Sequence, residues 1–163
     1  MITLNSDAAS TSLSKTTKAI LNEYGIKLNK NLGQNYLIDR NKRDQIIQFG
    51  NLTKDDVVLE IGPGIGTLTI ELAKRVKKVI AIEQDSNICQ ILENRLKKEN
   101  IDNVELINDD ALNVEFPKFD KIISNLPYQI SSPITFKFLN YDFQLAILMY
   151  QKEFASRMNG KVG

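Results

Sequence analysis

Val57-Val58-Leu59-Glu60-Ile61-Gly62-Pro63-Gly64-Ile65-Gly66 is an apolar run that ends in a glycine-rich turn. The run predicts a buried strand, and the glycines permit a tight turn with close approach of the backbone to a ligand. Their spacing is G-x-G-x-G, whereas the dinucleotide-binding fingerprint is G-x-G-x-x-G, and no lysine follows as a phosphate-binding P-loop requires. This stretch therefore predicts a strand-turn-helix unit that suits a nucleoside cofactor without a pyrophosphate. A purely structural turn would give the same glycine pattern.

Strand and helix patterns alternate along the rest of the chain. Residues 1–14 read as a flexible tail, residues 15–24 as a short helix that ends at Gly25, and Asp39 as the cap of a helix through about Phe49. Strands are predicted at 57–61, 79–83, 104–107, 121–124 and 145–150, and helices at 67–75, 86–98, 133–139 and 152–158. This alternation predicts an α/β fold with a mostly parallel sheet and helices on both faces. Because such a sheet normally continues, we expect residues 26–163 to be an incomplete domain.

Composition excludes several functional classes. The chain has 163 residues, of which 42% are hydrophobic and 25% charged, as expected of one folded domain. Its single cysteine, Cys89, and its lack of histidine exclude an internal disulfide, the common zinc clusters and Ser-His or Cys-His nucleophiles. No apolar run approaches the ~20 residues of a membrane span. We therefore expect a cytoplasmic monomer without a metal.

The net charge of +1 gives no global nucleic-acid signature, but basic residues gather near the N-terminus. Two acidic residues, Glu23 and Asp39, stand among them. The basic residues are Lys15, Lys18, Lys27, Lys30, Arg40, Lys42 and Arg43. A solvated surface and contacts to RNA phosphates explain this cluster equally well.

Carboxylates follow the next two predicted strands. Glu83 ends strand 79–83, about twenty residues after the glycine loop, where a carboxylate can accept hydrogen bonds from ribose hydroxyls. Asp110 follows strand 104–107 and could accept a hydrogen bond from an adenine amino group, although a helix-cap or turn role is equally consistent. A glycine loop, a carboxylate that can hold the ribose and an acceptor for the adenine thus follow three successive strands. This order predicts S-adenosylmethionine as the cofactor.

Asn125-Leu126-Pro127-Tyr128 follows the apolar strand 121–124. The Asn125 side chain and the Leu126 carbonyl can both accept hydrogen bonds from an exocyclic amine. Pro127 stiffens the loop, and Tyr128 offers an aromatic face on which a base can stack. Because ligands bind at the carboxyl ends of parallel strands, this tetrapeptide predicts chemistry on an amino nitrogen.

With these residues, the chain resembles the ribosomal RNA adenine dimethyltransferase family of the KsgA type. The sequences of its motifs are most similar to those of archaeal members. The matching segments are residues 32–37, 60–66, 109–112, 125–128, 129–133 and 149–155. Residues 32–37 alone would read only as an N-terminal turn. The family's usual glycine before the adenine-binding aspartate is Asp109 here, which adds a charge. The resemblance implies that family members continue through the rest of the methyltransferase core into a small helical C-terminal domain, and we expect both to be absent from residues 1–163.

The resemblance implies dimethylation, with S-adenosylmethionine, of the exocyclic amines of adjacent adenines in small-subunit ribosomal RNA or its precursor particle. The cofactor contacts that it implies are Gln34, Asn35, Leu37, Gly62, Gly64, Glu83, Gln84, Asp110, Ala111 and Asn125. Methyl transfer would belong to Asn125, Leu126, Pro127 and Tyr128. Tyr128 and Phe154 would lie on the two sides of the flipped base.

Other functions stay open beside this one. Related Asn-Pro-Pro-Tyr motifs serve DNA adenine and protein glutamine methyltransferases, but Leu126 replaces the first proline here. The motif is more similar to that of drug-resistance methyltransferases that act on large-subunit RNA, although the Leu126-Pro127 pair favours the small-subunit class. The non-enzymatic alternative is a nucleic-acid-binding assembly or transcription factor. The presence of Asn125 and Glu83 argues against that alternative.

Overall fold

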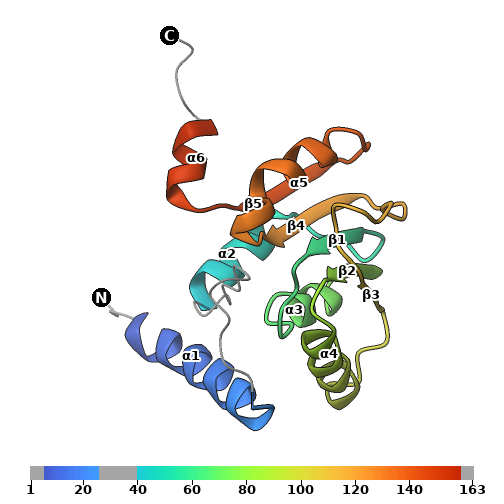
Figure 1. Ribbon diagram of the computed structural model, residues 1–163. Helices are drawn as coiled ribbons and strands as arrows, with labels where there is room; N and C mark the ends of the chain where they lie inside the picture. The colour runs from blue at the N-terminus through green and yellow to red at the C-terminus, as the bar shows by residue number, and fades with distance from the viewer. Residues whose placement is uncertain (1–5, 26–39, 159–163) are drawn as a thin grey trace.

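The computed structural model describes residues 6–25 and 40–158 (Figure 1). Within these ranges, five strands form one sheet in the order β3-β2-β1-β4-β5. The strands are β1 Val57–Ile61, β2 Lys78–Glu83, β3 Val104–Asn108, β4 Lys121–Asn125 and β5 Leu145–Met149. Each neighbouring pair is parallel, so the carboxyl ends of all five strands lie at one edge of the sheet. The predicted parallel α/β sheet is confirmed.

The helices follow the predicted alternation, although three of them begin or end at other residues than predicted, including the predicted helix 133–139, which is observed at Ser131–Phe138. They are α1 Ser6–Glu23, α2 Arg40–Phe49, α3 Thr69–Ala73, α4 Ser86–Lys98, α5 Ser131–Phe138 and α6 Lys152–Met158. Helix α1 begins at Ser6 rather than at the predicted Lys15, because a helix nucleated by a packed segment extends at little cost. Helix α3 is shorter than the predicted 67–75, since residues 67 and 68 still belong to the turn after the glycines. The predicted cap Asp39 lies outside the described residues.

Different helices bury the two faces of the sheet. In β2, Val79 and Ala81 pack with residues of α2 and α3, whereas Ile80 and Ile82 pack with Ile134 and other residues on the α5 side. This alternation follows from the period of two in a β-strand. Figure 1 shows the result, with α5 on one face and α3 and α4 on the other. Both faces are therefore apolar, as a parallel sheet requires.

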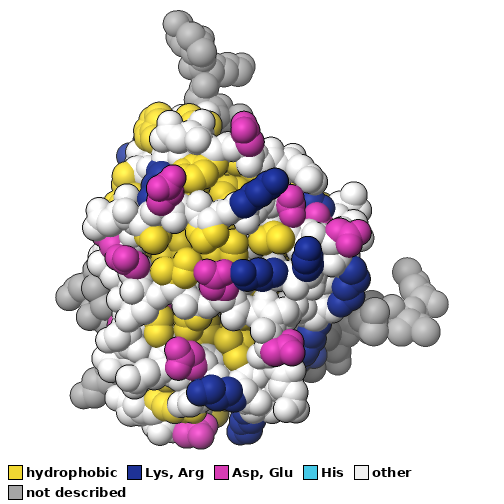
Figure 2. Space-filling view, turned by 90° about the vertical axis from the view of Figure 1, so that its right-hand side faces the viewer, with side chains coloured by type: hydrophobic (Ala, Val, Ile, Leu, Met, Phe, Trp, Pro, Cys, Tyr) yellow, Lys and Arg dark blue, Asp and Glu magenta, His cyan; other side chains and the backbone are white. Residues whose placement is uncertain are grey.

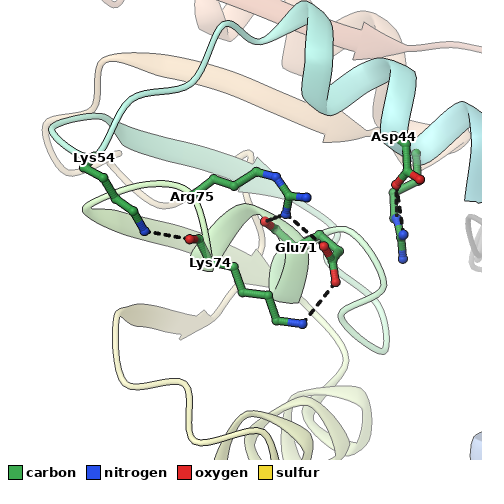
Figure 3. Close-up of polar contacts among 6 residues, drawn as sticks. Asp44, Lys54, Glu71, Lys74 and Arg75 are labelled. Carbon is green, nitrogen blue, oxygen red and sulfur yellow. Dashed lines mark hydrogen bonds and ion pairs between the residues drawn. The ribbon is translucent and has the colours of Figure 1, made fainter.

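The short helix α3 is held by polar contacts at its C-terminal end (Figure 3). Glu71 accepts hydrogen bonds from Lys74 at 3.1 Å and from Arg75 at 2.8 Å. Lys54 donates at 2.6 Å to the Lys74 carbonyl. Because such exposed pairs contribute little, the buried side chains of α3 stabilise it more than these contacts do. The side chains of Lys54, Lys74 and Arg75 are thus engaged with acceptors on α3 or directly after it.

The surface on the right-hand side of Figure 1 mixes both signs of charge. Figure 2 shows Lys and Arg interspersed with Asp and Glu around hydrophobic patches on this side. Such a mixture creates no large field of one sign, and so it does not mark a phosphate-binding surface. None of the described helices is both long and apolar enough to cross a membrane.

A buried ion pair closes the amino-terminal edge of the sheet. Lys121 at the start of β4 donates to Asp56 at 2.9 Å and to the Asn51 carbonyl at 2.8 Å. Both paired side chains are only 8% exposed. Burial alone would raise the pKa of Asp56, but hydrogen bonds from Lys121 and Thr53 hold it below its ordinary value. The pair therefore joins the segment before β1 to β4.

The two partners of this pair should not contribute independently to stability. We expect Lys121→Met to lower the free energy of unfolding by about 3 kcal/mol, because it leaves a buried carboxylate without its cation. The double variant with Asp56→Asn should lose less than the sum of the two single changes. Urea denaturation of the four proteins measures this, and strict additivity would contradict the account.

Candidate active site

The glycine loop after β1 lies directly against the tetrapeptide after β4. Gly62 has a φ of +68°, a backbone conformation that side chains rarely adopt. A Cβ atom there would lie 2.7 Å from Cγ of Pro127, which is closer than packed carbon atoms come. Gly62 also donates its N–H to the Ile82 carbonyl at 2.9 Å. Glycine is thus required where the loop, the tetrapeptide and β2 meet.

Ser124 fastens the two strands that carry these loops. Its hydroxyl donates to the Ile61 carbonyl at 2.6 Å and accepts from the Ile61 N–H at 3.2 Å. These bonds join β1 and β4 at their carboxyl ends. The strand order reverses between this pair, and in open α/β sheets ligands bind at such a switch point.

A cavity of about 370 Å³ opens at this point. It collects most of the site residues predicted from the described part of the chain, namely Gly62, Gly64, Glu83, Gln84, Asp110, Ala111, Asn125 and Pro127. The side chain of Leu126 is buried in the core below the loop, which leaves only its backbone for a ligand. Tyr128 begins a short 3₁₀ helix, Tyr128–Ile130, and is half-buried beside the cavity rather than in its lining. Gln34, Asn35 and Leu37 lie outside the described residues.

Glu83 is held at the rim of the glycine loop rather than solvated. Its carboxylate accepts from the Gly64 N–H at 3.2 Å and from the Asp85 N–H at 3.0 Å. Burial raises the pKa of Glu83, and the hydrogen bonds from Asp85 and Gly64 oppose that rise. The residue therefore shapes the loop and also faces the cavity.

Asp110 combines the two roles that its sequence position left open. Its carboxylate accepts from the Leu112 N–H at 2.9 Å, and its carbonyl accepts from the N–H groups of Asn113 and Val114. These bonds make a turn, and Asp110 with Ala111 also lines the cavity. The turn and ligand-facing roles are thus compatible.

Several lining residues were not assigned to the site from sequence. They include Glu60, Asp85, Asp109, Gln129 and Ile130, each of which lies within or directly beside a motif already recognised. With Glu83 and Asp110, five of the described lining residues are acidic, and none is lysine or arginine. A cavity of this charge attracts a cationic ligand and disfavours a phosphorylated one.

Glu60 is the most deeply buried of these carboxyl groups. It is 2% exposed, and its Oε2 has no hydrogen-bond partner among the described residues. Burial raises its pKa to about 8, and the charge of Glu83 adds to that rise. Glu60 is therefore largely protonated at neutral pH in the ligand-free protein.

Aromatic residues lie at the end of β5. The rings of Tyr150 and Phe154 are 4.9 Å apart, and the Tyr150 hydroxyl lies 2.6 Å from the Thr135 hydroxyl of α5. Phe154 thus packs on Tyr150, and its predicted contact with a substrate base stays a prediction. Within residues 6–25 and 40–158, no three His, Cys, Asp or Glu side chains are grouped so that they could hold a metal ion.

Comparison with known proteins decides the family. A family model described as "Ribosomal RNA adenine dimethylase" matches residues 25–163. This chain belongs to that family. The "Probable ribosomal RNA small subunit methyltransferase A" of Methanosphaera stadtmanae is 59% identical over 145 residues, which are 89% of this chain and 54% of that protein. The protein of the same description from Methanothermobacter thermautotrophicus is 56% identical over 147 residues, 90% of this chain and 53% of that protein. The dimethylase-family chain thus spans about half the length of these relatives.

Solved structures agree with this assignment. A dimethyladenosine transferase from Plasmodium falciparum superposes with a TM-score of 0.71 and 42% identity, over 76% of this chain and 46% of that one. The 23S rRNA methyltransferase ErmE superposes with a TM-score of 0.70 and 34% identity, over 79% of this chain and 53% of that one. The predicted Rossmann-like methyltransferase fold is therefore confirmed for the dimethylase-family chain.

The buried carboxyl of Glu60 should make stability depend on pH. In the folded protein Glu60 keeps its proton up to a pH of about 8, whereas the unfolded chain releases it near the ordinary glutamate pKa of about 4.5. The free energy of unfolding should therefore fall as pH rises between these values, by on the order of a few kcal/mol.

Glu60→Gln should remove this contribution while it preserves the shape of the side chain. We expect the urea-derived free energies of the two proteins to converge toward acid pH and to separate as pH rises to 8, with the variant more stable there. Parallel curves across this range would contradict the assignment of a raised pKa to Glu60.

Proposed function

We propose that this chain is the methyltransferase part of an enzyme that dimethylates the exocyclic amines of adjacent adenines in small-subunit ribosomal RNA, with S-adenosylmethionine as methyl donor. One observation carries the proposal. Asn125 and Pro127 line the same cavity as the glycine loop, Glu83 and Asp110. The loop that would bind the amine and the residues that would bind a nucleoside thus line one cavity, in a chain of the dimethylase family.

The lining fits this cofactor better than it fits a phosphorylated nucleotide. S-adenosylmethionine carries a sulfonium and an ammonium group, and the lining formed by the described residues has five carboxyl groups and no lysine or arginine. The buried Oε2 of Glu60, which has no hydrogen-bond partner among the described residues, gives the site a further polar atom for a ligand. Glu83 would hold the ribose hydroxyls and Asp110 the adenine amino group. The cofactor, when bound, supplies a methyl carbon that the sulfonium makes electrophilic.

The tetrapeptide would prepare the substrate amine. The lone pair of an adenine amine is conjugated with the ring, so the amine is a poor nucleophile. The side-chain oxygen of Asn125 and the carbonyl of Leu126 would accept its two N–H bonds and favour a pyramidal nitrogen whose lone pair points at the methyl group. Catalysis of this kind depends on orientation and electrostatics. No strong base is needed, because the nitrogen becomes acidic as the new bond forms and then releases its proton.

RNA binding would require an unstacked base and contacts to the phosphates. Tyr128 would stack on the extruded adenine and offset part of the unstacking cost. Lys15 and Lys18 are exposed and could contact phosphates, whereas Arg43 donates to Asp44 at 2.9 Å. Relatives that are 56–59% identical are described as small-subunit methyltransferases, which favours that RNA over the large-subunit RNA of ErmE at 34% identity. We expect the protein to act in the cytoplasm as a monomer.

Tyr128→Ala separates substrate stacking from cofactor binding. We expect the variant to bind S-adenosylmethionine within about twofold of wild type but to transfer methyl groups roughly 10- to 100-fold more slowly, since a stacked base contributes ~1–3 kcal/mol. Calorimetry gives the affinity. Mass spectrometry of dimethyladenosine in small-subunit particles gives the transfer rate.

Two further proteins complete this test. Phe136→Ala removes an aromatic ring that is 68% exposed on α5 and should change neither quantity. Asn125→Ala should reduce transfer most strongly, because it removes an acceptor for the amine. Equal loss of binding and transfer in Tyr128→Ala would contradict the stacking role. Absence of transferred methyl groups with the wild-type protein would contradict the proposed reaction.

A further inference from the structure

Lys137, in the last turn of α5, makes an unusual set of contacts. Its ammonium donates to the carbonyls of Ala111 at 2.8 Å and Leu112 at 3.2 Å, and also to the carbonyl of Val114. It lies 4.3 Å from the centroid of the Phe116 ring. A lysine ammonium has three N–H donors, and here all three are directed to one short backbone segment. A solvated surface lysine would make none of these bonds.

The segment that Lys137 holds is the turn at the adenine end of the proposed cofactor site. Asp110 and Ala111 at its start line the cavity. The N–H groups of Leu112, Asn113 and Val114 donate to Asp110, while carbonyls of the same turn accept from Lys137. The turn is therefore held through its carbonyl groups by Lys137 and through its N–H groups by Asp110. The same N–H groups fix the position of Asp110.

Helix α5 gives Lys137 a rigid base. Ile134 and Phe138 of this helix are completely or almost completely buried in the core. At its other end, the Ser131 hydroxyl donates to the Pro127 carbonyl at 3.3 Å. One helix thus contacts both the tetrapeptide and the turn of Asp110. Desolvation lowers the pKa of Lys137, and the charges of Asp110 and Glu115 oppose that change.

We propose that Lys137 is a positioning residue that orients the Asp110 carboxylate toward the amino group of the cofactor's adenine and so sets the preference for adenine over hypoxanthine. Hypoxanthine carries a carbonyl oxygen where adenine carries the amino group, and that oxygen would face the carboxylate without a proton between them. This inference rests on the proposed function, because it takes the cofactor to be an adenosine derivative.

The test compares two thioethers whose bases differ in the group at C6, which is an amino group in adenine and a carbonyl oxygen in hypoxanthine, and in the proton that hypoxanthine carries on N1. S-adenosylhomocysteine and S-inosylhomocysteine are titrated by calorimetry into the wild-type chain, Lys137→Met, Lys137→Arg and a matched control, Lys118→Met. Lys118 is exposed and lies outside the cavity lining. We expect wild type and Lys118→Met to prefer the adenosine compound by ~10-fold or more, as one hydrogen bond to a charged acceptor allows.

Lys137→Met should lose most of this preference, because its affinity for the adenosine compound alone should fall. Lys137→Arg should retain part of the preference. If the role of Lys137 were purely structural, the affinity for both compounds would fall equally. That result, or no change in either affinity, would overturn the inference. If circular dichroism shows that Lys137→Met is unfolded, the preference of Lys137→Arg and of Lys137→Gln decides. A wild-type chain that binds neither compound would instead contradict the proposed cofactor.

Discussion

The backbone of Gly62 packs so closely on Pro127 that the end of β1 and the end of β4 form one surface. Ser124 strengthens this junction by bonding to both polar groups of the Ile61 backbone. Because the strand order reverses here, the loops on either side diverge and leave a cavity between them. The other parts of the site, from Glu83 to Asp110, are arranged around this junction by the parallel strands that carry them.

The electrostatics of the cavity follow from the same arrangement. Parallel strands bring the residues after β1, β2 and β3 to one edge, and in this sequence many of those residues are acidic. Backbone N–H groups stabilise part of that charge, as at Glu83, while the buried Glu60 is relieved by keeping its proton. The ligand-free site thus holds more carboxyl groups than it can ionise at neutral pH. A cationic ligand would relieve that strain, which connects the charge pattern with the proposed cofactor.

Sequence patterns predicted the parts of this structure that depend on local periodicity. The bounds of β1, α4 and α6 match the predicted ranges, because the periodicity of apolar residues acts within a few residues. Polar residues after successive strands could also be assigned to one edge, since parallel topology brings them together. The start of α1 was missed because a Ser- and Thr-rich segment resembles a tail. The contact of Gly62 with Pro127, the burial of Glu60 and the bonds of Lys137 depend on tertiary packing, for which no local pattern exists.

We infer that this junction builds a pocket for a cationic nucleoside rather than for a nucleotide. Calorimetric titration of the folded chain with S-adenosylmethionine and, separately, with ATP distinguishes the two. We expect saturable binding of S-adenosylmethionine that Glu83→Gln weakens, and no measurable binding of ATP, because ATP brings phosphates to carboxyl groups and the described lining residues include no lysine or arginine. Binding of ATP that equals or exceeds that of S-adenosylmethionine, or failure of a demonstrably folded chain to bind S-adenosylmethionine, would contradict the claim.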